Sequence, residues 1–144
     1  MSIQHFSAMT MLGGGGVALT ATAKTVVALN PITTCVAGIR FLSGGILQRR
    51  QNATYTAYSG EWCDPQSVGV GSDYDIYAQS ISSSGVSSSS GTFNTWLNLG
   101  SNREWNISRT TTGTATRTIR FSFRPAGGGS TLLTIDISLQ ATRS

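Results

Sequence analysis

The sequence predicts an all-β protein: an antiparallel β-sandwich or jelly roll of about eight to nine strands, with an extended N-terminal arm. Three observations lead to this prediction. Only 11% of the 144 residues are charged and 17 are glycine, a composition typical of short strands joined by polar turns. Apolar and polar residues alternate over several segments, as they do on strands with one buried face. Glycine, proline and asparagine separate these segments, as turns require.

The N-terminal segment differs in composition from the rest of the chain. Residues 1–30 are predicted to form the arm and residues 31–144 the sandwich domain. A run of four glycines cannot build a core of its own, so we expect a neighbouring subunit to hold this segment. The predicted assembly residues are Gly13, Gly14, Gly15, Gly16 and Val17.

The first strand is predicted over residues 17–27, which are rich in threonine and valine, and it ends before Asn30-Pro31. A glycine turn at Ser43-Gly44-Gly45 predicts a hairpin between the next two strands. The serine-rich residues 82–91 are predicted to form a loop. The strands predicted between residue 31 and residue 110 are 34–42, 46–51, 54–62, 73–81, 95–99 and 103–109.

The strongest strand signal lies near the C-terminus. Ile119, Phe121 and Phe123 alternate with polar residues, and a second alternating run follows the glycine-rich turn at 125–130. This pattern predicts a hairpin with one face in the core and one face in solvent. Arg120 and Asp136 fall on the outer face, where they are expected to form a cross-strand ion pair.

The two cysteines, Cys35 and Cys63, lie beside apolar residues. A protein built on disulfides carries a denser set of cysteines, so we expect two buried free thiols. No further cysteine or histidine stands at metal-ligand spacing. The sequence therefore predicts no metal site and no cofactor.

The search for catalytic residues points away from an enzyme. The single histidine, His5, lies in the predicted arm, which argues against a nucleophile–histidine site. Asp73 and Asp75 are expected to share a strand face, as a carboxyl pair for glycoside hydrolysis would require. The favoured interpretation is that such acids are turn residues at strand ends. No catalytic residue is assigned.

The chain carries a formal charge of +4, with arginines concentrated in residues 101–144. These arginines are dispersed and have no interleaved aromatic platform, so we expect them to cover the outer face of a sheet rather than bind a specific nucleic acid. No apolar run approaches the ~18 residues of a membrane span. Neither nucleic acid nor membrane is an expected partner.

The three tryptophans, Trp62, Trp96 and Trp105, are the candidates for ligand contact. Aromatic rings on a surface stack on sugars, which would make the protein a glycan-binding module. The alternative is that these rings fill the middle of the sandwich, because Trp96 and Trp105 stand in alternating apolar patterns. The core interpretation is favoured.

Residues 36–142, about three quarters of the chain, resemble a family of small structural proteins and domains of tailed bacteriophages and prophages. Two segments depart from the family pattern: the turn Leu42-Ser43-Gly44-Gly45 and the N-terminal arm. The matching positions mark core and turn residues and transfer no binding residue. They are Ala37-Gly38-Ile39-Arg40-Phe41, Tyr55, Gly60-Glu61-Trp62, Asp73-Tyr74-Asp75, Gly91-Thr92, Trp96-Leu97, Leu99, Arg103, Trp105 and Ile119-Arg120.

The resemblance implies a non-enzymatic structural protein of a phage virion, assembled in the bacterial cytoplasm. Two locations are open: a decoration or cement protein on the capsid, or a component of the tail or its fibres that binds host glycans. The size and the arm favour decoration. The expected partners are the major capsid or tail proteins and further copies of the chain in the particle.

Overall fold

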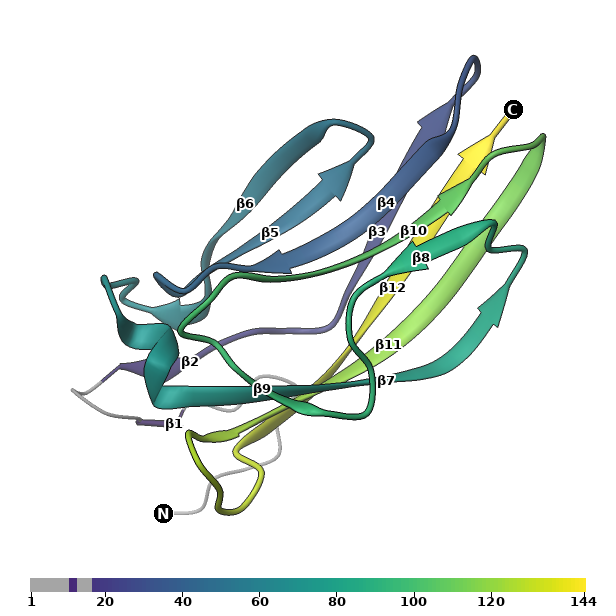
Figure 1. Ribbon diagram of the computed structural model, residues 1–144. Helices are drawn as coiled ribbons and strands as arrows, with labels where there is room; N and C mark the ends of the chain where they lie inside the picture. Colours follow the sequence, from purple (N-terminus) through teal and green to yellow (C-terminus); the bar gives the residue numbers. More distant parts are fainter. Residues whose placement is uncertain (1–10, 13–16) are drawn as a thin grey trace.

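The computed structural model describes residues 11–12 and 17–144. Two sheets pack face to face as a sandwich (Figure 1), which confirms the predicted all-β class. Helical structure in this part of the chain is one 3₁₀ turn, Val70–Asp73. None of its helical segments has the length and apolar character needed to cross a membrane.

The larger sheet has seven strands and the smaller sheet has five. Their pairs are antiparallel except for β3 and β12, which run parallel. The large sheet runs in the order β1 (Met11–Leu12), β2 (Ala18–Leu19), β6 (Thr54–Asp64), β5 (Ile46–Gln51), β4 (Cys35–Phe41), β10 (Arg103–Arg109) and β8 (Ser88–Ser90). The small sheet runs in the order β3 (Lys24–Asn30), β12 (Leu133–Arg143), β11 (Gly113–Pro125), β7 (Tyr74–Ser84) and β9 (Trp96–Asn98).

Most predicted strands are present with small changes in their ends. The described residues form twelve strands, more than the eight to nine predicted, and eight of them have six or more residues. The others, β1, β2, β8 and β9, have two or three residues. Strands this short carry little alternation, and of the four only β9 was predicted as a separate strand, within residues 95–99.

The predicted strand over 17–27 is wrong, because β2 belongs to the large sheet and β3 to the small sheet. The chain crosses between the sheets over residues 20–23, where Ala21 is buried. Glu61 of β6 fixes this crossing: its carboxylate accepts from the Thr22 amide at 2.9 Å and lies 3.1 Å from Lys24 Nζ. The structure thus includes residues 17–30, which were predicted as part of the arm, in the sandwich.

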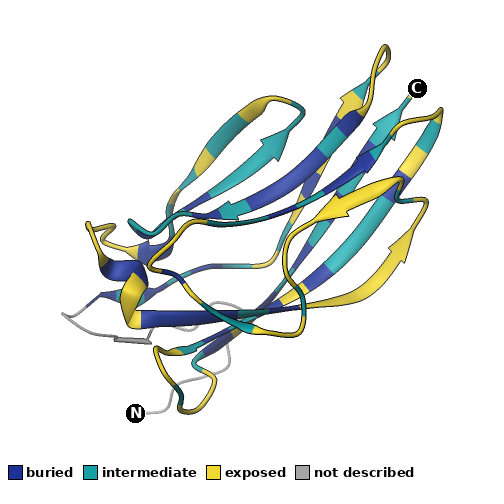
Figure 2. Ribbon diagram, in the orientation of Figure 1, coloured by how far each residue is buried: buried dark blue, intermediate teal, exposed yellow. Residues whose placement is uncertain are grey.

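The predicted loop at 82–91 is also wrong. β7 continues to Ser84, and β8 follows after a short turn and pairs with β10. Side chains on β8 and the end of β7 are exposed (Figure 2). Serine has a low strand preference, but backbone pairing to β11 and β10 overrides it.

The C-terminal hairpin is confirmed and is longer than predicted. β11 and β12 pair over eleven positions, from Gly113↔Arg143 to Phe123↔Leu133. The Arg120 guanidinium donates to both carboxylate oxygens of Asp136, at 2.9 and 3.1 Å. The predicted ion pair therefore forms, on the outer face of the small sheet.

An aromatic cluster joins the two sheets. Phe41 of β4 packs edge-on against Trp105 of β10 and against Phe121 and Phe123 of β11, with ring centroids 5.1–6.1 Å apart. Trp62 of β6 stacks on Phe123 at 5.7 Å. All five rings are almost fully buried, so this cluster is the centre of the core.

Cys35 and Cys63 are free and buried, as predicted. Burial raises the pKa of Cys63 to about 12, and the nearby charge of Asp73 acts in the same direction. Burial also raises the pKa of Cys35. Because the thiolate is the reactive form, both thiols are held in the unreactive state at neutral pH.

Replacement of Phe41→Ala is expected to destabilise the protein by about 3–5 kcal/mol, because it leaves a cavity among three aromatic rings. Urea unfolding of the two proteins measures this difference. The control is Leu29→Ala, which truncates a side chain that is 65% exposed on β3 and is expected to change stability by less than about 0.5 kcal/mol. Similar losses for both variants would contradict the assignment of Phe41 to the core centre.

Candidate functional site

The structure separates the three tryptophans. Trp62 and Trp105 are buried at 0% and 1% exposure. Their indole nitrogens donate to the backbone carbonyls of Leu42 and Thr92, both at 2.8 Å. These two side chains are core residues and lie out of reach of a glycan.

Trp96 is partly exposed, on the outer side of the small sheet. Its ring lies 5.1 Å from that of Tyr77, on the neighbouring strand β7. The Arg124 guanidinium lies 4.3 Å from the centre of the Trp96 ring. Of the three predicted sugar contacts, Trp96 is the one that retains exposed aromatic surface.

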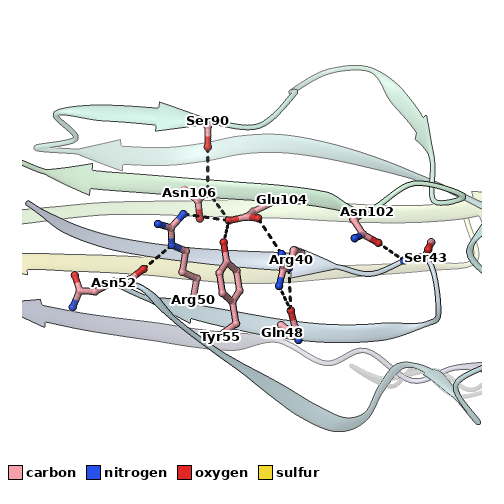
Figure 3. Close-up of polar contacts among 10 residues, drawn as sticks. All are labelled: Arg40, Ser43, Gln48, Arg50, Asn52, Tyr55, Ser90, Asn102, Glu104 and Asn106. Carbon is pink, nitrogen blue, oxygen red and sulfur yellow. Dashed lines mark hydrogen bonds and ion pairs between the residues drawn. The ribbon is translucent and has the colours of Figure 1, made fainter.

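A polar network centred on Glu104 crosses the outer face of the large sheet (Figure 3). The Glu104 carboxylate accepts from the Tyr55 hydroxyl at 2.6 Å and from the Asn106 amide at 2.8 Å. Arg50 Nη1 lies 3.4 Å and Arg40 Nη1 3.9 Å from the same carboxylate. The network joins β4, β5, β6 and β10, because these residues stand at or next to paired positions of adjacent strands.

Aromatic contacts and further hydrogen bonds fix the two guanidinium groups of this network. Arg40 lies 3.8 Å from the Tyr55 ring centre and donates twice to the Gln48 side-chain oxygen, at 2.7 and 2.9 Å. Arg50 Nε donates to the carbonyl of Asn52 at 2.6 Å. With both arginines bound within the sheet, the network stabilises the pairing of its strands.

Gly38 makes room for this network. It pairs with Asn106 on one side and with Arg50 on the other. A Cβ atom at position 38 would lie 1.8 Å from Asn106 Oδ1, so no other residue fits without moving Asn106. The glycine in Ala37-Gly38-Ile39 is therefore explained by the side chain that lies across it.

The pKa values of the acids follow from these contacts. Burial alone would raise the pKa of Glu104, but hydrogen bonds from Tyr55 and Asn106 and the charges of Arg40 and Arg50 lower it overall. Burial also opposes ionisation of Asp75, and hydrogen bonds from Asn98, Gly127 and Arg124 again lower the pKa overall. A carboxyl with a lowered pKa is ionised at neutral pH and is poorly suited to be a general acid.

The structure does not bring Asp73 and Asp75 onto one strand face. Asp73 ends the 3₁₀ turn and is exposed, whereas Asp75 lies in β7, is buried, and pairs with Arg124 at 3.0 Å. Within the described residues, no three metal-binding side chains gather at one point.

A shallow groove of about 200 Å³ runs beside the Glu104 network, at the edge of the large sheet. Its lining includes Arg50, Asn106 and the three serines of β8. Asn106 Nδ2 donates to Ser90 Oγ at 3.2 Å, and the hydroxyls of Ser88 and Ser108 are 2.5 Å apart. The hydroxyl groups of this groove are thus largely engaged with one another.

Strand β3 and the residues just after it carry exposed apolar side chains. Val27 and Leu29 of β3 and Ile32, just after its end, are 40%, 65% and 75% exposed, and we call these three residues the apolar stripe. They are three of the five large hydrophobic side chains exposed in the described part of the chain. The stripe was missed from sequence, because Val26 and Val27 are both apolar and the alternation there does not show which face is outside.

The predicted assembly residues divide between two regions. Gly13, Gly14, Gly15 and Gly16 lie outside the described residues. Val17 is 7% exposed and belongs to the hydrophobic core, next in sequence to β2. The described surface closest in sequence to the glycines that is both apolar and exposed is the stripe on β3.

Comparison with known proteins adds no relative: no family model, curated protein or solved structure matches the chain.

Replacement of Glu104→Gln is expected to lower the free energy of unfolding at pH 7 by roughly 1–2 kcal/mol, because the ion pairs and charge-assisted hydrogen bonds are lost. Folding lowers the pKa of Glu104 from its ordinary value of 4.5. The stabilisation is therefore fully present above pH 4.5 and is lost as the pH falls through the lower pKa of the folded state.

Urea unfolding of wild type and variant across this pH range measures the effect, and the two stabilities are expected to converge in acid. Asp136→Asn is the matched control, because it breaks a well-exposed ion pair of the other sheet and is expected to have a smaller effect. A pH-independent difference between wild type and Glu104→Gln would contradict the role given to the Glu104 charge.

Proposed function

We propose that this chain is a non-enzymatic structural protein of a tailed-phage virion, a capsid decoration or cement protein that acts through contacts with neighbouring subunits. The resemblance of residues 36–142 to small structural proteins of tailed phages supports the virion assignment. The observation that carries the role in assembly is the apolar stripe on β3.

The stripe is suited to a protein contact. Exposed apolar groups that gather at one place mark interaction surfaces more often than single ones do. Leu29 and Ile32 stand on either side of Asn30-Pro31, and Arg143 Nη1 donates to the Pro31 carbonyl at 3.2 Å. A surface held in place in this way loses little conformational entropy when it binds.

The polar surfaces support the same role. Four of the six acids, Glu61, Asp75, Glu104 and Asp136, form ion pairs with basic side chains within the domain. These pairs connect neighbouring strands, or connect the segment that crosses between the sheets to β6, and they stabilise the domain. A decoration protein needs a rigid domain with a defined contact surface rather than an enclosed pocket.

In a tailed phage that encodes the chain, deletion of residues 2–16 is expected to reduce its incorporation into particles strongly, because the glycine-containing segment is the proposed anchor. Quantitative mass spectrometry of purified particles measures the copy number. Normal incorporation of the deleted chain would overturn the anchoring role of this segment.

The stripe has its own test in the same system. Leu29→Asp and Ile32→Asp together are expected to reduce the copy number at least about tenfold, since burial of two charges at an interface is strongly unfavourable. Val68→Asp is the control, because Val68 is fully exposed and lies outside the stripe. Wild-type incorporation of the double variant, or absence of the wild-type chain from particles, would contradict the proposal.

A second candidate function is a glycan-binding component of the tail or its fibres. Trp96 favours it, because a partly exposed indole beside Tyr77 is the kind of surface on which a sugar ring stacks. Arg124 lies close by and offers a hydrogen-bond donor. Decoration is preferred, because the Arg124 guanidinium already covers part of the Trp96 ring.

The second candidate predicts that Trp96→Ala weakens binding of the protein to host-cell polysaccharide at least about tenfold, the loss expected for one stacking aromatic. Glycan-array and sedimentation assays measure this binding, with Val68→Ala as the control. Equal binding by wild type and Trp96→Ala, or no binding by either, would remove this candidate.

A further inference from the structure

The two sheets of the sandwich differ in width at the side of β3. The small sheet ends at β3, whereas the large sheet continues from β4 to β5 and β6. β3 contacts β4 and β5 across the sandwich, so the first half of β6 overhangs the edge of the small sheet. Figure 1 shows the β5–β6 hairpin at the side of the large sheet, beyond β4.

A groove of about 390 Å³ lies under this overhang, between β3 and the β5–β6 hairpin. We call it the β3 groove. Lys24, Thr25 and Val27 line it from β3, and Arg49, Gln51 and Tyr58 line it from the hairpin. It has the position that a sixth strand of the small sheet would occupy.

The backbone groups on the groove side of β3 are positioned to pair with such a strand. The carbonyls of Val27 and Leu29 accept hydrogen bonds from the side chains of Gln51 at 2.6 Å and Asn52 at 2.9 Å. Both donors lie on the side away from β12. Because the backbone groups of a strand point alternately to its two sides, Thr25 also presents its N–H and C=O to the groove. The Gln51 amide thus occupies the place of a backbone donor from an added strand.

The charge of the groove indicates what kind of strand fits. Lys24 is neutralised by Glu61, at 3.1 Å. Arg49 lies 5.5 Å from the Tyr58 ring centre and donates to Gln51 Oε1 at 3.3 Å. Within residues 17–144, Arg49 has no carboxylate partner. A carboxylate from outside would pair with Arg49, whose side chain is half-buried, through charge-assisted hydrogen bonds.

We propose that the β3 groove accepts an extended segment of a neighbouring virion protein, which pairs with the edge of β3 that faces away from β12, in place of the side-chain amides of Gln51 and Asn52, and places a carboxylate side chain against Arg49. This inference names the partner chemistry of the proposed assembly surface and rests on the proposed function. Strand addition to a sheet edge draws affinity from backbone hydrogen bonds and specificity from alternate side-chain contacts.

The edges formed by β7, β8 and β9 are less suited to strand addition. The pairing of β7 with β11 shifts register between Thr118 and Ile119, which marks a bulge in β7, and bulges at sheet edges oppose further pairing. β8 and β9 have three residues each. β3 has seven residues and is flanked by the groove.

The test uses the purified full chain and synthetic seven-residue peptides of alternating threonine and valine with a central Glu, Gln or Lys. NMR titration of ¹⁵N-labelled protein reports binding and its location. The Glu peptide is expected to bind at least about tenfold more tightly than the Lys peptide, and to shift the amide signals of Thr25 and Val27 most.

Three variants separate the contributions of the Gln51 amide, the β3 backbone and the Arg49 charge to peptide binding. Gln51→Ala removes one of the two side-chain amides that compete for this edge and is expected to tighten binding of all three peptides several-fold. Val27→Pro removes the N–H that faces the groove and is expected to weaken binding of all three, while pairing to β12 is kept because proline is tolerated at an edge. Arg49→Glu is expected to reverse the preference between the Glu and Lys peptides, whereas Arg120→Glu, with the same change in net charge, is not.

Several outcomes would overturn the inference: equal binding of the three peptides, shifts that map to β8 or β9, or a preference unchanged by Arg49→Glu. Sedimentation that shows pairing of two copies through β3 would also overturn it, because a second copy would then be the occupant. Peptide binding by a chain that is absent from particles would contradict the proposed function alone. Normal incorporation with no peptide binding would contradict the groove alone.

Discussion

The packing of Phe41 against Trp105, Phe121 and Phe123 is the interaction on which the rest of the structure depends. These rings place β4 and β10 opposite β11 and thereby set how the two sheets overlap. Because the small sheet has two strands fewer, an overlap centred on Phe41 leaves the first half of β6 beyond the edge of β3. The surface that we assign to assembly is therefore a consequence of how the core is packed.

Polar residues stabilise the arrangement of strands that the aromatic core sets. Glu104 and its partners tie four strands of the large sheet together from outside, and Glu61 holds the segment that crosses between the sheets. Both carboxylates lie where water is partly excluded, so their hydrogen bonds to fixed donors contribute more than exposed pairs do. Most charged groups of the domain are therefore paired with other groups of the same domain. Arg49, which faces a groove, is an exception.

Sequence patterning predicted the elements in which one face is buried and the other is in solvent. The β11–β12 hairpin, with its Arg120–Asp136 pair, follows directly from alternation, and β5 and β10 were predicted with the bounds that they have. Sequence patterning failed where pairing between distant strands determines the structure. One case is β8, whose three serines have no strand preference. The other is residues 17–30, where the chain passes from one sheet to the other. The apolar stripe and the β3 groove were not predictable, because they depend on the relative width of two sheets.

The central claim is that the side of the sandwich formed by β3 faces a neighbour in the particle. Cryo-electron microscopy of an intact tailed phage that carries this chain, at a resolution that separates strands, tests this claim most directly. We expect a neighbouring protein to cover Val27, Leu29 and Ile32. We also expect an extended segment of that protein to lie along β3 beneath the β5–β6 hairpin. A particle in which β3 faces solvent and the domain is held by another surface would contradict it.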